Sequence, residues 1–343
     1  MKKEFNFLII SIFLLFMMSC ACSKNAAKSN NNNEETGTDT NLTFVQKHGA
    51  LQVKGTALLD AEGNTIVLRG VSLGWHNWWP RFFNADAIHT LANEWKCTLV
   101  RIPLGIEPDG AYLDNPELGE KCVNDAVDAC IKEGIYCIID WHSHHIRTEE
   151  ARKFFSKMAF KYGDVPNVIF EIFNEPDNTT NWPDVKAYSE EVIKTIRDVS
   201  PKSIILVGNP YWDQKIRLCA DNPIENVSNI MYTVHFYAGT HKQELRDETS
   251  YALSKGLPVF ISECAGMGAS GGEDINQGEW QKWLAFMAEN NLSYDIWSLT
   301  DKENETCSML LPSASDGGPW PDENLNTWGK IVKSLIIFKN SKI

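Results

Sequence analysis

The sequence has no cluster of Lys and Arg residues that could neutralise a row of phosphates. Its 343 residues carry a formal net charge of -13, and the 32 basic residues are scattered along the chain. Binding to nucleic acid relies on phosphate neutralisation by basic side chains. Nucleic acid is therefore excluded as the expected partner, and no P-loop sequence indicates a nucleotide site.

Cysteine supplies neither a zinc site nor a complete disulfide framework. Seven Cys residues follow the N-terminal segment, an odd number, and no CxxC pair occurs. We expect most of them to be buried thiols. His142, His144 and His145 form a dense histidine group, but no carboxylate or Cys completes a known ligand spacing around them. No metal and no cofactor are predicted.

The composition is that of an ordinary globular protein, with 43% hydrophobic and 22% charged residues. The 12 Trp residues are many for this length. We expect most of them in the core, but exposed indoles also bind the apolar faces of sugar rings. A neutral polar ligand fits this composition better than a phosphorylated one.

The N-terminus reads as a leader for export. Lys2 and Lys3 precede an apolar run from Phe7 to Met18, which is too short to span a membrane. Ser19-Cys20 resembles a bacterial lipoprotein cleavage site, so we expect residues 1–19 to be removed and Cys20 to carry lipid. Cys22 is an alternative lipid site, and ordinary cleavage with free secretion is the other interpretation.

Residues 20–41 contain almost no large apolar side chains and are expected to be a flexible tether. The catalytic domain is expected to cover residues 42–343. It begins with two short alternating segments around Asp60–Asn64, which predict a small β-hairpin before the main fold.

Eight short apolar runs follow, separated by polar loops and amphipathic stretches. Continuous β-branched and aromatic runs are typical of parallel strands covered on both faces. The runs are Ile66–Leu73, Leu99–Leu104, Tyr136–Trp141, Val168–Phe173, Ile204–Val207, Met231–Phe236, Val259–Ser262 and Tyr294–Leu299. The helical stretches between them include Glu117–Glu133, Glu149–Tyr162, Lys186–Val199, Gln243–Leu257 and Gln277–Asn290. Eight such units predict a (β/α)8 TIM barrel with a short N-terminal β-hairpin.

Polar residues close most of these runs, where a barrel of this kind places its active site. Six strand ends carry such residues, at Arg101, Asp140–His142, Asn174–Pro176, His235–Tyr237, Glu263 and Trp297. Any single one could be an ordinary polar residue at a strand end. Six together predict a functional site at the mouth of the barrel.

Glu175 and Glu263 are 88 residues apart, which is three barrel units, so we expect them on strands four and seven, facing each other. Two such carboxyls suit cleavage of a glycosidic bond, at a separation of roughly 5 Å for retention of configuration. Arg101 and the Tyr237 hydroxyl could keep Glu263 ionised, whereas Glu175 would need a raised pKa.

Asn174-Glu-Pro176, His235-Phe-Tyr237 and Ser262-Glu263 resemble glycoside hydrolase family 5, and Ile139–His142, Pro166–Ile169, His235–His241 and Trp297–Lys302 resemble its bacterial endoglucanases. The resemblance covers about residue 45 to the end. It implies Glu175 as acid/base and Glu263 as nucleophile. It also implies Asn174 at the sugar 2-hydroxyl and Trp297 beneath the sugar. The residues implied around the nucleophile are Arg101, His142, His235 and Tyr237.

The same resemblance implies outer sugar subsites. Trp78, Trp79 and Trp212 would be aromatic platforms, and Lys302 with Glu305 would grip a sugar. The chain departs from the family pattern at Gly74–Asn77, where many relatives have a His-Gly pair two residues before His76. We include His76 as a candidate contact.

The expected activity is retaining endo-β-1,4-glucan hydrolysis by an exported monomer whose partner is a β-glucan polysaccharide. The assignment of a glucan as the substrate depends on the resemblance more than on the chemistry of the two glutamates. Alternatives within the fold are a β-mannanase or a glucanase for xyloglucan or mixed-linkage chains. An alternative of another class is a surface glycan-binding lipoprotein that has lost catalysis. A serine nucleophile at Ser262 fails, because no GxSxG motif surrounds it.

Overall fold

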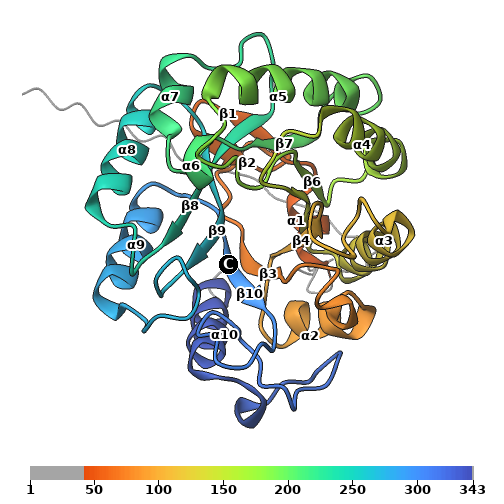
Figure 1. The fold of residues 1–343 in the computed structure, drawn as a ribbon, viewed down its shortest axis with the longest axis vertical. Coiled ribbons are helices and arrows are strands. Elements are labelled where there is room, and N and C mark those ends of the chain that lie inside the picture. The colour runs from red at the N-terminus through yellow and green to blue at the C-terminus, as the bar shows by residue number, and fades with distance from the viewer. Residues whose placement is uncertain (1–41, 342–343) are drawn as a thin grey trace, which may run out of the picture. The chain divides into compact units, whose positions relative to one another are not determined.

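Eight parallel strands close into a barrel in this computed structural model, which describes residues 42–341 (Figure 1). The strand order around the barrel is β10, β3, β4, β5, β6, β7, β8 and β9. Their bounds are β3 Arg69–Leu73, β4 Leu99–Gly105, β5 Tyr136–His142, β6 Val168–Glu171, β7 Ile204–Val207, β8 Ile230–Tyr237, β9 Val259–Ala265 and β10 Tyr294–Leu299. The predicted (β/α)8 barrel is therefore confirmed.

The helices form a ring outside the strands (Figure 1). The long ones follow the strands in chain order: α2 Ala85–Asn93, α3 Pro116–Glu133, α4 Thr148–Tyr162, α5 Trp182–Arg197, α8 Gln243–Ser254, α9 Gln277–Glu289 and α10 Thr327–Asn340. Shorter elements are α1 Phe44–His48, η1 Pro80–Phe82, α6 Pro210–Asp213, α7 Ile216–Asp221 and η2 Asp322–Asn324. Buried apolar faces of these helices pack on the outside of the barrel.

The predicted hairpin exists, but its turn lies elsewhere. Strands β1 (Gln52–Lys54) and β2 (Ala57–Leu59) pair antiparallel across Gly55 and Thr56. The segment Asp60–Asn64 is a separate turn, in which the Asp60 carboxylate accepts from the backbone N–H groups of Glu62 and Asn64. It is followed by a single bridge between Leu59 and Thr65. The run Asp60-Ala-Glu-Gly-Asn64 thus marked a turn correctly, but not the one between the two regular strands.

The N-terminal segment closes one end of the barrel. Val45, Leu51, Leu58, Ile66 and Leu68 form one buried cluster with residues from the amino-terminal halves of the strands, namely Leu99, Tyr136, Ile138, Ile169, Ile204, Leu206, Met231 and Phe260. Apolar burial removes this end from water. The carboxyl ends of the strands remain the open mouth.

Two element ends differ from the predicted ones for local reasons. Strand β6 ends at Glu171, and Asn174 and Glu175 instead donate backbone hydrogen bonds to the carbonyls of Trp141 and Ser143. Helix α5 begins at Trp182 because the Asn181 side chain caps it and Pro183 occupies its first turn.

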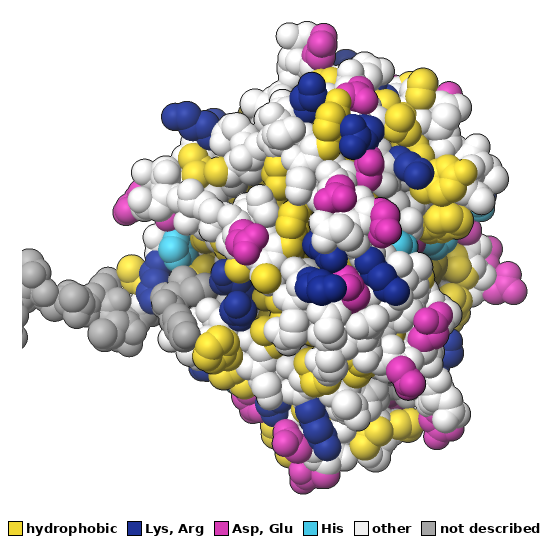
Figure 2. Space-filling model, turned by 90° about the vertical axis from the view of Figure 1, so that its left-hand side faces the viewer, with side chains coloured by type: hydrophobic (Ala, Val, Ile, Leu, Met, Phe, Trp, Pro, Cys, Tyr) yellow, Lys and Arg dark blue, Asp and Glu magenta, His cyan; other side chains and the backbone are white. Residues whose placement is uncertain are grey.

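One face of the described chain carries charges of both signs (Figure 2), and none of the described helices could span a membrane. On the face shown in Figure 2, acidic and basic side chains are interspersed. No helix between residues 42 and 341 combines the length and the apolar character needed to cross a bilayer. The seven cysteines from Cys97 to Cys307 are all buried and unpaired, as expected. The leader (1–19), the lipid site Cys20 and the tether (20–41) lie outside the described residues.

One buried carboxyl in the barrel wall lacks a hydrogen-bond partner. Asp295 on β10 is fully buried, and neither of its side-chain oxygens has a partner within residues 42–341. Cys97 and Cys264 are close enough for its charge to affect their thiols. Burial raises the pKa of Asp295 well above its usual value, Arg101 opposes this, and Glu171 adds to it. The folded protein therefore holds Asp295 in its neutral form.

We expect Asp295→Asn to change how stability depends on pH. Above about pH 4 the unfolded chain ionises at this position while the folded chain stays protonated, so folding stability falls by up to ~1.4 kcal/mol per pH unit. The loss continues until the pH passes the raised folded-state pKa. The variant lacks this loss, so its free energy of unfolding should gain on that of the wild type as pH rises from 4 to 7.

Urea unfolding at several pH values measures this difference. Asp198→Asn is a matched control, because the Asp198 side chain is 62% exposed and should give a flat difference across the same range. A pH-independent difference for Asp295→Asn as well would contradict a neutral buried carboxyl.

Candidate active site

The open mouth of the barrel brings the central predicted residues together. Arg101 lies on β4, His142 ends β5, and His235 and Tyr237 lie on β8. Glu263 is on β9, directly opposite His235 in the strand register. Asn174 and Glu175 follow β6, and Trp297 lies on β10. Because all eight strands run in the same direction, these side chains meet at one end.

Arg101 is the centre of this group. Its side chain is fully buried, and its guanidinium donates to Glu171 at 2.7 Å and to Glu263 at 2.8 Å. The remaining donor group reaches Asn174 at 2.6 Å and Asp140 at 2.9 Å. One planar guanidinium thereby fixes groups from three other strands and the segment after β6.

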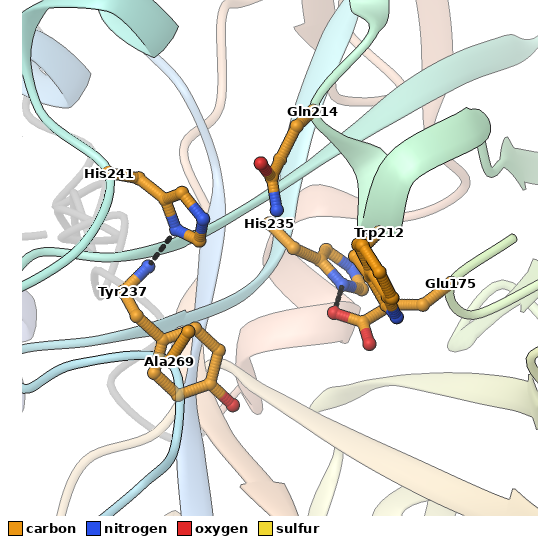
Figure 3. Close-up of a pocket in the computed structure, with 7 residues that line it drawn as sticks. All are labelled: Glu175, Trp212, Gln214, His235, Tyr237, His241 and Ala269. Carbon is orange, nitrogen blue, oxygen red and sulfur yellow. Dashed lines mark hydrogen bonds and ion pairs between the residues drawn. The ribbon is translucent and has the colours of Figure 1, made fainter. Parts of the chain in front are cut away.

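Glu263 and Glu175 face each other with different partners. The Tyr237 hydroxyl donates to Glu263 at 2.7 Å, on the oxygen that Arg101 does not contact. Glu175 lies 3.0 Å from Nδ1 of His235. Figure 3 marks this contact with a dashed line. Carboxylate oxygens of the two glutamates lie within 4.8 Å of each other. This spacing fits the short separation of carboxyls that favours retention.

The electrostatics of the pair differ from the expectation. Burial raises the pKa of Glu263, nearby Glu175 raises it further, and His235, Arg101 and Tyr237 do not outweigh them. Burial also raises the pKa of Glu175, but the hydrogen bond and the charge of His235, with smaller contributions from His144 and Arg101, together outweigh it and lower the pKa. The prediction that Glu175 has the raised pKa is wrong for this structure, because the His235 cation lies against Glu175.

His235 is cationic for a clear reason. Burial alone would lower its pKa, but Asp213, Glu171, Glu175 and Glu263 around it raise the pKa well above the usual value. Two buried cations, Arg101 and His235, therefore face five carboxyls at the mouth: Asp140, Glu171, Glu175, Asp213 and Glu263. Not all five can be ionised together.

Two cavities flank the glutamate pair. One has a volume of about 460 Å³ and is lined by Glu175, His235 and Tyr237 with Trp212, Gln214, His241 and Ala269 (Figure 3). The other, about 190 Å³, lies over Trp297 and includes Trp75, Trp78, Trp79, Lys302 and Glu305 among its lining residues. Tyr237 and Ala269 line both cavities. The predicted platforms thus lie on two sides of the glutamate pair.

Neighbouring side chains hold Trp297, Lys302 and Glu305 in place. The Trp297 ring stacks on His142, with ring centroids 5.4 Å apart and planes 8° apart. His142 in turn lies 2.6 Å from Asp140. Lys302 donates to Glu305 at 2.8 Å. These contacts restrict the rings and charges that face the second cavity.

His76 lines neither cavity, and its hydrogen bond goes to the backbone of β4 and not to the other candidate residues. Its side chain is fully buried, and its Nδ1 accepts from the Gly105 backbone N–H at 3.0 Å. Burial lowers the pKa of His76 to about 4, so the ring is neutral. His76 thus holds the last residue of β4 through this hydrogen bond.

A strained turn carries Trp212 into the cleft. Tyr211, Trp212 and Asp213 all have positive φ, at 61°, 54° and 61°. Left-handed conformations cost non-glycine residues ~1–3 kcal/mol each and persist where the surroundings enforce them. Here the Trp212 N–H donates to the Pro176 carbonyl at 2.9 Å, which ties the turn to the segment of Glu175. Sequence patterns give no signal for such a turn.

Other lining residues were also missed as site candidates. Trp75, Gln214, His241 and Ala269 are examples. Asp213 was missed too, although it is buried behind the cavities and lines neither. The segment Gly266–Gly271 fits the spacing GxGxxG, but α9 begins only at Gln277, and Ala269–Gly271 line the second cavity instead. The position of Gly266–Gly271 directly after the strand of Glu263 could have marked this segment as part of the site.

Two groups of side chains within residues 42–341 have donor atoms close enough to surround a metal ion: Glu171, Asp213 and His235, and Glu175, His235 and Glu263. Both depend on His235. A histidine must be neutral to bind a metal, and the surrounding carboxylates keep His235 cationic. His142, His144 and His145 do not form such a group. The donor set therefore fits proton transfer better than metal binding.

Comparisons with known proteins agree with this geometry. The family described as cellulase, glycosyl hydrolase family 5, matches residues 59–303. An endoglucanase from Clostridium saccharobutylicum is 38% identical over 98% of this chain and 72% of that protein. Endoglucanase 5 from Pectobacterium carotovorum is 40% identical over 86% of this chain, which spans 59% of that protein's length.

Solved structures show the same likeness. A protein from Cytophaga hutchinsonii is 43% identical, with a TM-score of 0.86, covering 88% of this chain and 98% of that one. The catalytic domain of an endoglucanase from Thermobifida fusca is 30% identical, with a TM-score of 0.81, covering 86% of this chain and 99% of that one. By its family match, its relatives and its fold, this chain belongs to the cellulase family, glycosyl hydrolase family 5.

Proposed function

We propose that this chain is a retaining endo-β-1,4-glucanase that acts on internal bonds of β-glucans. The observation that carries the proposal is the pair Glu175 and Glu263, whose carboxylate oxygens lie within 4.8 Å of each other between two aromatic-lined cavities. The names of the endoglucanase relatives support the choice of β-glucan.

In the first step Glu263 attacks the anomeric carbon as the glycosidic carbon–oxygen bond breaks, and Glu175 gives its proton to the leaving oxygen. In the second step Glu175 accepts a proton from water, whose oxygen attacks that carbon and releases Glu263. Arg101 and Tyr237 hold Glu263 in position through both of its oxygens. The net configuration at the anomeric carbon is retained.

Neighbouring groups have roles in binding. The Asn174 side-chain nitrogen is buried and has no hydrogen-bond partner within the described chain, so it can donate to a sugar hydroxyl. Trp297 stacks beneath the sugar next to the scissile bond. Trp78, Trp79, Lys302 and Glu305 serve subsites on one side, and Trp212 serves the other. A chain bound across both sides is cut at an internal bond.

We expect soluble cellulose to release reducing ends faster than xyloglucan, mixed-linkage glucan, mannan or xylan when the panel is assayed under one condition. Glu263→Gln keeps the shape of the side chain and removes the nucleophile, so activity should fall about a thousandfold or more. Proton NMR of early wild-type product should show the β-anomer first.

Each alternative gives a different result in the same panel. Faster cleavage of mannan would replace the glucanase assignment with a mannanase. Binding to glycans without any cleavage by the wild type would favour a glycan-binding lipoprotein. Activity that survives in folded Glu263→Gln would remove Glu263 as nucleophile.

Glu175→Ala should separate the two catalytic steps. Loss of the acid should slow glucan cleavage by about 10²–10⁴-fold, and aryl glycosides with acidic leaving groups should lose less, because they need no proton. Added azide should restore turnover, since azide attacks the glycosyl-enzyme without a general base. Unchanged leaving-group dependence in this variant would contradict the acid/base role.

We further infer that the chain is exported by its leader and anchored by lipid at Cys20, with the catalytic domain as a monomer. In a bacterial host fed a labelled fatty acid, the full chain should be labelled and Cys20→Ser should not. Retained label in Cys20→Ser with loss in Cys22→Ser would move the lipid to Cys22. An unlabelled wild-type chain would contradict the anchor.

A further inference from the structure

Asp213 is a buried carboxyl at the active site that no motif singled out. It ends the left-handed turn that also carries Trp212, and its side chain is fully buried. Its Oδ1 accepts from the Asn209 backbone N–H, and its Oδ2 contacts the Thr233 hydroxyl. The same Oδ2 lies 3.3 Å from Nε2 of His235.

His235 connects Asp213 to Glu175. Its Nδ1 lies 3.0 Å from Glu175, on the side of the cleft. Its Nε2 faces acceptors only: the Ser262 hydroxyl oxygen at 2.9 Å, Asp213 at 3.3 Å and Glu171 at 3.6 Å. The Ser262 hydroxyl is itself donated to Glu171. Nε2 therefore carries a proton, and a second proton is shared between Nδ1 and Glu175.

We propose that Asp213 is a positioning residue that acts through His235: it orients Nδ1 toward Glu175 and, when ionised, helps retain the proton that His235 and Glu175 share. The proposal rests on the acid/base role proposed for Glu175. Asp213 is not among the residues that line the cavity beside Glu175. Its effect on catalysis therefore passes through the His235 imidazole.

The protonation of Asp213 follows from its neighbours. Burial raises the pKa of Asp213 to about 8, with the His235 cation and the Thr233 hydroxyl opposing. The Thr233 hydroxyl contacts both the Val207 carbonyl and Asp213, but it has a single hydrogen to donate. While Asp213 is neutral it can donate to Thr233, which then donates to Val207. Once Asp213 is ionised the Thr233 hydrogen turns to the carboxylate, and this donation is what lowers the pKa. Asp213 is neutral at neutral pH and ionises in the alkaline range.

Ionisation of Asp213 adds a negative charge on the far side of the imidazole from Glu175. A negative charge there favours every protonated form of the His235–Glu175 pair. As pH rises, the pair therefore keeps its proton longer than it would beside a neutral group. Since Glu175 must carry a proton to act as the acid, Asp213 extends activity toward alkaline pH.

Other titratable groups also surround His235 and Asp213, and among them burial raises the pKa of Asp140 and of Glu263. These groups are Arg101, Asp140, His142, Glu171, Glu175, Cys219, Tyr237, His241 and Glu263. Burial raises the pKa of Cys219 well above its usual range, and the same is true of Tyr237. Arg101 holds Glu171 and Glu263 at fixed contacts. Asp213 is the group next to His235 whose ionisation falls near pH 8.

The test compares kcat and KM on soluble cellulose for wild type and Asp213→Asn from about pH 6 to 10. Asn has nearly the same shape and cannot ionise at any pH. We expect kcat within about twofold of wild type near pH 6, falling to about a tenth of wild type above pH 9, a shift of one pH unit in the alkaline limb. KM should stay nearly constant, because Trp212 is not moved.

Two further variants sharpen the test. Thr233→Val removes the hydroxyl that helps Asp213 ionise, so its alkaline loss should have the same direction and a smaller size. Asp295→Asn replaces another buried aspartate that does not face His235, so its kcat relative to wild type should not depend on pH.

A kcat ratio for Asp213→Asn that stays constant with pH, or that rises above pH 8, overturns the inference. If Glu175→Ala is inactive on glucan while the Asp213→Asn ratio is flat, the proposed function stands and the role of Asp213 fails. If Glu175→Ala keeps full activity, the proposed function itself fails. If Asp213→Asn does not fold, a flat ratio for Thr233→Val overturns the inference.

Discussion

The buried guanidinium of Arg101 is the interaction on which the site depends. An unpaired buried cation is costly, and Arg101 avoids this cost only because Asp140, Glu171, Asn174 and Glu263 surround it. These partners come from β5, β6, the segment after β6 and β9. Removing any one of them takes a hydrogen-bond partner from the buried guanidinium, so the positions of the strand ends and of the residues around both glutamates depend on each other.

The same cluster contains more acid than base, and this excess has a chemical use. Carboxyls that cannot all ionise must share protons, and small changes in their surroundings decide which one holds a proton. His235 lies between Glu175 on one side and Asp213, Glu171 and Ser262 on the other. The protonation of the proposed acid is therefore a property of this whole network, and not of Glu175 alone.

The turn at Tyr211–Asp213 links binding to this network. Its left-handed backbone points Trp212 into the cleft beside Glu175 and buries Asp213 against His235. The stacking platform Trp212 and the titratable carboxyl of Asp213 thus share one short, strained segment. The opposite wall is different, since Trp297 is supported by stacking on His142 and by the bond from His142 to Asp140.

The sequence by itself determined the barrel and its main catalytic candidates. Eight apolar runs with helices between them are local patterns, and parallel strands bring the residues at their ends together. The sequence alone therefore grouped Arg101, Asn174, Glu175, His235, Tyr237, Glu263 and Trp297. The hairpin turn was misplaced because Asp60–Asn64 satisfies its own backbone, which looks the same in sequence as a turn between strands.

Only the tertiary structure decided how protons are distributed. Which cation lies against which glutamate depends on a contact between β8 and the segment after β6, and this contact reversed the expected pKa directions of Glu175 and Glu263. Tertiary contacts also place His76 against the backbone of β4 and Asp213 against His235. Strand patterns are set by neighbours in sequence, whereas burial and charge are set by residues far apart in the chain that meet when the barrel closes.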